Sequence, residues 1–333
     1  MCNSIHLFLT PALSDPHESR QQEYAEPPDK RRLRVFLTAM MLVLACAGPP
    51  DNALTWREQW ELLILTEDGG LVDARITVGN TGILRKQGHL RANRWSAIDS
   101  PILFSLDGGP GDVDISDSHD AVRVGSSLLG RYESGDNWTL RVSDETANAI
   151  IHIDPGGPEV PLATGLNESG QWTMSTPITH GAAHGWFTAA RRGGMFEGRS
   201  IALQRGGDGF AGPRRASFVV SNGISIGIDE QGEQRLAWAR IGDMDIAMND
   251  LEQSFGPNGE HILDFRPAAD LVVSLRPTNT GGTTRTDEHL YAPERAIASM
   301  TGLTSTRTVH RADVDVVHEG ATRTASGVIV QTH

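Results

Sequence analysis

The residues best suited to bind a ligand are concentrated between Trp186 and Arg215. Arginine suits a carboxylate or phosphate, because its planar guanidinium can form two parallel hydrogen bonds. Aromatic side chains with a few polar groups are typical of ligand pockets. Packing of the aromatics in an ordinary core, with the arginines in solvent, is the alternative interpretation. Alternation in RLAWARI adds a tryptophan that shares a strand face with an arginine. The candidate ligand-binding residues are therefore Trp186, Arg199, Asp208, Arg214 and Trp238.

A possible serine nucleophile lies in the segment GISIG, residues 223–227, which matches the pattern G-x-S-x-G. That pattern is catalytic where a strand, a strained turn and a helix follow one another. Here Ile224, Ile226 and Ile228 alternate with Ser225, which is the period of a β-strand. We therefore expect a strand at this point, and the sequence motifs assign no catalytic residue.

Two other patterns resemble metal sites. His180 and His184 stand four residues apart, a spacing that binds zinc on a helix. They lie in a glycine-containing segment between strands, so we expect a linker with surface histidines. The run 107–120 contains five aspartates, and calcium favours clustered oxygen ligands. It lacks the glycine of the EF-hand order, so a solvated loop is expected. We predict neither a metal nor a cofactor.

The N-terminal region resembles a bacterial lipoprotein signal. The apolar run Val35–Ala45 follows four basic residues, as in a secretory signal, and is shorter than the ~20 apolar residues that span a bilayer. Val43–Cys46 resembles a lipobox, which implies lipidation of Cys46 and cleavage before it. A plain signal peptide cleaved nearby is the alternative. We assign residues 1–45 to a leader and lipoprotein signal peptide and residues 46–54 to a tether.

The expected location follows from this signal. Several acyl chains on Cys46 would give stable membrane attachment. Ala47 follows the cysteine, and by resemblance to enterobacterial lipoproteins the absence of an aspartate there favours the outer membrane. The polar residues 1–29 before the signal indicate either a start codon assigned too early or a long leader. We expect a lipid-anchored protein of the cell envelope, facing the periplasm or the surface.

Composition excludes one class of partner. The formal net charge is −13, whereas nucleic-acid binding requires clustered lysine and arginine. The chain has two cysteines, so a lipidated Cys46 leaves no disulfide in the mature chain, and stability must come from buried apolar area. From Cys46 to the end the sequence is long enough for two domains or one large one.

The elements expected after the tether are short β-strands separated by glycine turns. Trp60–Leu65 and Leu71–Asn80 flank a turn at Asp68 and Gly69, which predicts a hairpin. No stretch has the pattern of a long amphipathic helix. The series of strands divides near residue 180, so we predict a first β-barrel domain at 55–180 and a second at 181–333.

The strand segments resemble a known group of proteins. WREQWELLILTEDGGLVDARITVGNTGIL, HGWFTAARRGGMFEGRSIALQRGGDGF, QRLAWARIGDMDI, LDFRPAADLVVSL and ASGVIV are similar in kind and order to segments of the carotenoid hydratase and yeast survival-factor group. Fungal pericyclic cyclases of decalin biosynthesis belong to the same superfamily. The resemblance covers most of residues 55–330. It implies an all-β fold of two lipocalin-like antiparallel β-barrels packed together, with a hydrophobic ligand cavity in or between them.

Three functions compete at this point. The first is a lipid-anchored envelope protein that binds a hydrophobic small molecule, a lipid or isoprenoid, and needs no catalytic residue. The second is an enzyme like the related hydratases and cyclases, acting on an apolar polyene with an acid such as Asp208 as proton donor. The third is an envelope scaffold without a ligand. We favour the first, since no catalytic constellation is evident.

Overall fold

The computed structural model describes residues 56–81, 84–96, 101–116, 120–131, 137–156, 160–167, 170–207, 214–221, 223–232, 234–242, 244–246, 251–257, 259–266, 270–278, 282–285 and 306–332. The chain divides into two units, Met1–Cys46 and Ala47–His333, and every described residue belongs to the second. The predicted signal peptide, Cys46 and the tether lie outside the described residues. Within the described part of the chain, no helix is long and apolar enough to cross a membrane.

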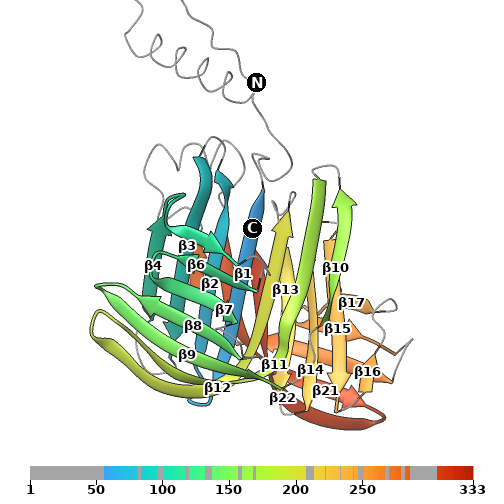
Figure 1. The fold of residues 1–333 in the computed structure, drawn as a ribbon. Coiled ribbons are helices and arrows are strands. Elements are labelled where there is room, and N and C mark those ends of the chain that lie inside the picture. The colour runs from blue at the N-terminus through green and yellow to red at the C-terminus, as the bar shows by residue number, and fades with distance from the viewer. Residues whose placement is uncertain are drawn as a thin grey trace, which may run out of the picture. The chain divides into compact units, whose positions relative to one another are not determined.

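The first twelve strands form one antiparallel sheet (Figure 1). Its order is β4-β3-β2-β1-β12-β11-β9-β8-β7-β6-β5, and β10 pairs with β11. The strands are β1 (Arg57–Thr66), β2 (Leu71–Thr81), β3 (Leu84–Trp95), β4 (Ile102–Gly108), β5 (Val113–Ile115), β6 (Ala121–Val124), β7 (Ser127–Arg131), β8 (Trp138–Ser143), β9 (Ala147–Pro155), β10 (Val160–Asn167), β11 (Gly170–Ala189) and β12 (Arg192–Gly207).

The remaining strands form a second antiparallel sheet, of ten strands. Its order is β16-β15-β14-β13-β22-β21-β19-β18-β17, and β20 pairs with β21. The strands are β13 (Arg214–Ser221), β14 (Ile224–Gln231), β15 (Gln234–Ile241), β16 (Met244–Ile246), β17 (Glu252–Phe255), β18 (His261–Asp264), β19 (Leu271–Pro277), β20 (Gly282–Arg285), β21 (Thr306–His318) and β22 (Ala321–Thr332).

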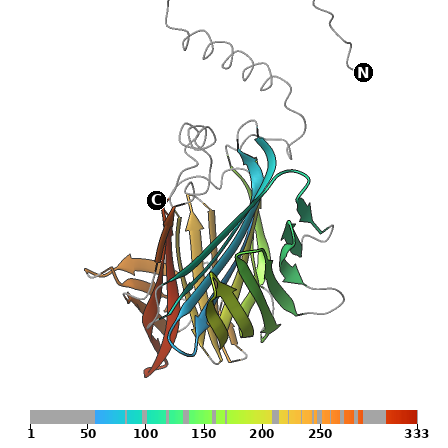
Figure 2. The same ribbon diagram turned by 90° about the vertical axis from the view of Figure 1, so that its left-hand side faces the viewer.

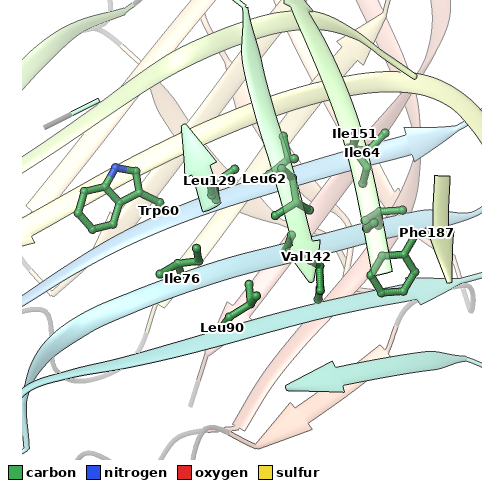
Figure 3. Close-up of a cluster of buried hydrophobic side chains, with 14 of the residues drawn as sticks. Trp60, Leu62, Ile64, Ile76, Leu90, Leu129, Val142, Ile151 and Phe187 are labelled. Carbon is green, nitrogen blue, oxygen red and sulfur yellow. The ribbon is translucent and has the colours of Figure 1, made fainter. Parts of the chain in front are cut away.

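Each sheet curls around its own apolar core. In the first sheet, Trp60, Leu62 and Ile64 of β1 belong to a buried cluster with residues of β2, β3 and β6–β9 (Figure 3). The two ends of this sheet approach each other, since a Cβ on Gly88 of β3 would lie 2.5 Å from Val113 of β5. The second sheet encloses a separate cluster. The all-β, lipocalin-like double-barrel fold is therefore confirmed.

The alternation of β1 explains how the two sheets meet. Its even-numbered residues fill the first sheet, so its odd-numbered residues point to the other face. Leu63 and Leu65 on that face pack in a third cluster together with Phe218 and Val330 of the second sheet. The outer faces of the two sheets are thus joined by an apolar interface. Figure 2 shows β1 in blue between the orange and red strands of the second sheet and the green strands of the first.

The predicted hairpin is confirmed. The register pairs Leu65 with Leu71, and the amide of Gly69 donates to the carbonyl of Thr66 at 3.0 Å. Gly69 has a φ of 84°, a conformation that glycine adopts without steric cost. The strand expected at GISIG is also present, as β14. Its isoleucines lie in the core of the second sheet, whereas Ser225 faces the first.

The sheet boundary is not where the sequence placed it. The expected division at residues 180 and 181 falls inside β11, and the change of sheet comes between β12 and β13. The glycines of the supposed linker instead permit close strand packing. A Cβ on Gly181 would lie 2.7 Å from Ser200 Oγ, and one on Gly185 would lie 2.2 Å from the carbonyl oxygen of Ile150. Glycine is required at these positions because neighbouring strands approach closely, not because the segment is a flexible linker.

Candidate functional site

The candidate site is the interface between the two sheets, which is built in three layers. Four strands pass through the interface. Along each strand, the side chains that face the other sheet are first charged, then apolar, and finally line a groove. Successive side chains on one face are two residues apart, so each strand supplies all three layers. The series are Glu61, Leu63 and Leu65 on β1; Arg205, Leu203, Ile201 and Arg199 on β12; Arg214, Ala216, Phe218 and Val220 on β13; and Arg307, Val309 and Arg311 on β21.

Glu61 is the centre of the charged layer. It is 1% exposed, and its carboxylate contacts three arginines from three other strands. Arg214 Nη1 donates to Glu61 Oε2 at 2.9 Å, Arg205 Nη2 lies 3.5 Å from the same oxygen, and Arg307 Nη2 donates to Oε1. One carboxylate of the first sheet therefore joins two arginines of the second, and the contact fixes how the sheets are placed against each other.

Two aspartates complete the charged layer. Asp229 of β14 accepts two hydrogen bonds of 2.7 Å from Nε and Nη2 of Arg214, a bidentate pair. Asp73 of β2 accepts from Nη2 of Arg307 at 3.1 Å and from its Nε at 3.3 Å. Arg205 also donates to Gln231 Oε1 at 3.0 Å. Together with Glu61, the two aspartates give three negative charges. These match the three positive charges of the arginines that contact Glu61.

The balance sets the protonation states. Burial alone would raise the pKa of Glu61, but the charges of Arg214, Arg307 and Arg205 outweigh it and hold that pKa far below its usual range. A further guanidinium, Arg75 of β2, is buried nearby. Burial and then the charge of Arg307 lower the pKa of Arg75 to about 9. Glu61 therefore stays ionised at neutral pH, so it acts as a fixed electrostatic clamp, not as a proton donor.

The apolar layer contains Trp238, which is 3% exposed. Its ring stacks on Phe218 with centroids 5.5 Å apart. Trp238 Nε1 donates to Ser225 Oγ at 3.2 Å, and Ser225 Oγ donates to the carbonyl of Thr179 at 2.6 Å. The indole also occupies the space above Gly227, where a Cβ would lie 2.4 Å from the ring. Trp238 is therefore a packing residue that links the sheets through a serine.

The third layer is a groove of about 490 Å³. Leu65, Arg199, Val220 and Arg311 line it from β1, β12, β13 and β21. Arg311 Nη1 donates to the carbonyl of Gly69 at 2.7 Å, which holds its guanidinium in place. Arg199 has no hydrogen-bond or ion-pair partner among the residues that the structure describes. The groove thus combines the apolar side chains of Leu65 and Val220 with the carboxylate of Glu67 and two arginines, of which Arg199 has no partner among the described residues.

The predicted ligand-binding residues fall in different places. Arg199 lines the groove, Arg214 belongs to the charged layer, and Trp238 belongs to the apolar layer. Trp186 is half-buried in β11, where its inward-facing neighbour Phe187 lies in the first core; Trp186 therefore points to the outer face of that sheet. Asp208 lies outside the described residues. The structure brings three of the five to one interface, and only Arg199 to a cavity.

A second polar arrangement, which the sequence did not predict, lies inside the second sheet. Ser217 Oγ is 2.5 Å from His261 Nδ1, His261 Nε2 is 3.1 Å from Gln253 Oε1, and Gln253 Nε2 donates to Glu230 Oε2 at 2.7 Å. Because an amide oxygen only accepts, His261 donates from Nε2 and accepts the serine proton at Nδ1. Burial, then the charge of Arg215, lowers the pKa of His261 to about 4. The imidazole is therefore neutral at pH 7.

The motifs considered for metal binding have other surroundings. His184 lies opposite His152 of β9, with ring centroids 5.6 Å apart, and His180 is on the same long strand rather than on a helix or in a linker. In the acidic run, Asp107 bonds to His89, and Asp112 accepts from the amide of Gly109. Asp117 lies outside the described residues. These aspartates belong to strand ends and turns.

The charged layer was missed, although it left a trace in the sequence. Glu61 interrupts the apolar run WELLIL, and Asp73 and Arg75 interrupt LVDARITV. Charged residues are almost never fully buried unless they are paired. A charge on the inter-sheet face of each of several strands is therefore a signal for a buried ion network. The sequence could not predict which strands supply the partners, because residues such as Glu61 and Arg307 are far apart in sequence.

The architecture defines a class of protein, the double lipocalin-like β-barrel. The sequence matches no protein-family model and no curated protein. Among solved structures, a Nitrosomonas europaea protein assigned as AttH has a TM-score of 0.56 at 10% identity, over 85% of this chain and 95% of that chain. CghA with bound Sch210972 has a TM-score of 0.57 at 10% identity, over 84% and 88%. Kievitone hydratase from Nectria haematococca has a TM-score of 0.51 at 11% identity, over 85% and 90%.

These likenesses show the fold. They extend over both sheets of this chain and agree with the fold that the strand segments indicated. One of the three similar structures is named as a hydratase, and another was solved with Sch210972. A shared fold does not carry a shared activity, so function must be argued from the residues of this chain.

Proposed function

We propose that this chain is a lipid-anchored cell-envelope protein that binds a lipid or isoprenoid with an acidic end group in the groove between its sheets. The observation that carries the proposal is Arg199, an arginine without a partner among the described residues, facing a cavity of about 490 Å³. Arg311 supplies a second cation there, and Leu65 and Val220 supply apolar surface. A carboxylate or phosphate would satisfy the guanidinium of Arg199.

The charged layer has a supporting part in this proposal. It holds β1, β12, β13 and β21 in register at one end of the interface. Because the same strands line the groove at the other end, the two arginines there are presented by rigid elements. Rigid presentation lowers the ordering cost of binding. The anchor at Cys46 would keep the groove next to the membrane from which an apolar ligand is taken.

The test uses native mass spectrometry of the gently purified full chain, followed by organic extraction. We expect a reproducible excess mass that extracts as a lipid or polyene. In titrations with farnesyl phosphate, Arg199→Gln should weaken binding by about ten-fold or more, because a charged hydrogen bond is lost. Arg323→Gln on the exposed part of β22 is the matched control. Farnesol, which lacks the charge, should bind the wild type and Arg199→Gln equally. A clean mass with no uptake would favour the scaffold instead.

A second candidate function is favoured by the Ser217–His261 contact. A neutral imidazole that accepts a serine proton is the arrangement of a general base. It would serve the hydratase or cyclase alternative as the base that takes a proton from the added water or the substrate, while the proton donor is a separate acid such as Asp208. The fold shared with kievitone hydratase also supports this alternative. The experiment is incubation with polyenes and detection of a product heavier by one water or isomeric with the substrate. Product that persists in both Ser217→Ala and His261→Gln would remove this pair from the reaction.

A further inference from the structure

A second cavity, of about 510 Å³, lies on the outer face of the first sheet, over β5 to β8. Val122 and Leu140 point into the first core, so their strand neighbours Arg123 and Arg141 point outward. Figure 1 shows β7, β8 and β9 one after another on the near side of this sheet. The cavity therefore opens away from the core of its own sheet. Its lining shares no residue with the groove between the sheets.

The charge of this cavity is opposite to that of the whole chain. Three arginines, Arg123, Arg131 and Arg141, and one acid, Asp114, are in its lining, which leaves an excess of two positive charges among these residues. The chain as a whole carries −13. Neither Arg123 nor Arg141 has a hydrogen-bond or ion-pair partner within the described part of the chain. Like charges facing one cavity repel, and a bound anion removes that repulsion.

An apolar strip continues from the arginines across the sheet. The register places Arg141 of β8 opposite Ile150 of β9, Ile150 opposite Trp186 of β11, and Trp186 opposite Met195 of β12. Directly opposed side chains on one face are in contact range. Met195 is 73% exposed, and Ile150 and Trp186 are half-buried. At about 4.8 Å per strand, the strip extends about 14 Å from Arg141 to Met195.

We propose that this outer face binds a monomeric single-chain amphiphile with an anionic head. The head, a phosphate or carboxylate, lies on Arg123 and Arg141, and the alkyl chain lies along Ile150, Trp186 and Met195. The side-by-side order of cations and apolar groups matches the order of head and chain in such a molecule. This site accounts for Trp186, which the ligand groove between the sheets leaves out, and it stands or falls independently of that groove.

The experiment is calorimetric titration of the purified full chain with dodecyl phosphate below its micelle concentration. Inorganic phosphate provides the head alone, and dodecyl maltoside provides the chain without charge. We expect dodecyl phosphate to bind most tightly. The double variant Arg123→Gln and Arg141→Gln should weaken its binding by about ten-fold or more. Met195→Ser should weaken dodecyl phosphate and leave inorganic phosphate unchanged. All three positions are exposed, so these variants should fold, and Arg323→Gln is the charge-matched control.

Arg199→Gln separates the two sites. If it abolishes dodecyl phosphate binding while the double variant binds normally, the groove is the only site and the outer-face proposal is wrong. Binding no tighter than that of inorganic phosphate would remove the role of the apolar strip. Binding to vesicles of anionic phospholipid without binding to the monomer would show a membrane contact in place of a ligand site. Loss in the double variant with normal binding in Arg199→Gln supports the proposal.

Discussion

Replacing Glu61 with glutamine tests whether the charged layer holds the sheets together. Glu61 is 1% exposed and is shared by Arg205, Arg214 and Arg307. Glutamine keeps the shape and one acceptor oxygen but removes the negative charge, leaving these three arginines with two aspartates. Removing one partner of a buried ion pair costs about 3–5 kcal/mol, because the remaining charge is uncompensated. We expect a loss of that size in the free energy of unfolding.

The loss should be visible in thermal unfolding. Unfolding entropy is about 2.1 cal/mol/K per residue, so for a unit of this length a loss of about 3–5 kcal/mol lowers Tm by roughly 5–8 °C. The assay is circular dichroism during heating, with urea titration to compare free energies. Glu145→Gln, in the exposed turn between β8 and β9, is the control and should stay within about 0.5 kcal/mol of the wild type.

A second variant makes the test specific for charge balance. Adding Arg307→Met to Glu61→Gln leaves two arginines and two aspartates, so the double variant should lose less stability than the sum of the two single variants. Residues in one ion network show coupling of about 0.5–3 kcal/mol. If Glu61→Gln is as stable as Glu145→Gln, or if the two changes are strictly additive, the layer is not the clamp that we describe.

Three further outcomes follow from the structure. The lowered pKa of His261, about 4 against about 6.5 when unfolded, means that its contribution to stability is fully present above pH 6.5 and is lost as pH falls toward 4. His261→Gln should flatten this fall in stability, which is on the order of 3 kcal/mol, in urea titrations across pH. Gly227→Ala should cost about 1–3 kcal/mol and change the near-ultraviolet dichroism of Trp238, because its Cβ would lie 2.4 Å from the ring; an unchanged spectrum and Tm would contradict this packing. Cys46→Ser should abolish labelling by radioactive palmitate and leave the protein unprocessed or soluble, and labelling that persists would disprove lipidation at this cysteine.

The fold was readable from local patterns. The hairpin at Asp68 and Gly69 and the strand at Ile224 depend on residues that are neighbours in the chain, and both are present. Period-2 alternation shows which residues share a face but not what covers that face. For this reason Arg214 and Trp238 were assigned to a ligand pocket, whereas the structure covers them with the other sheet.

The sheet boundary failed for a related reason. Glycine at positions 181 and 185 has two explanations, a flexible linker or a close approach of neighbouring strands. Only the partner strands decide between them, and these are β9 and β12, which lie on either side of β11 in the sheet. The contact between Ser217 and His261 could not be predicted from the sequence either. Its members are 44 residues apart and belong to no spacing motif.

The layered interface explains why one pair of packed faces contains both a rigid contact and a possible ligand site. Along β12, Arg205 is satisfied by Gln231 and faces Glu61, whereas Arg199, six residues away on the same face, has no partner among the described residues. Both are arginines on the same face of one strand, so neither residue type nor strand position distinguishes a structural arginine from a ligand-binding one. The surroundings do, since Glu61 of the neighbouring strand β1 and Gln231 of the opposite sheet are partners of Arg205, whereas Arg199 lines a cavity. An arginine in such a fold is therefore a binding candidate only where neither its neighbouring strands nor the opposite sheet supplies a partner.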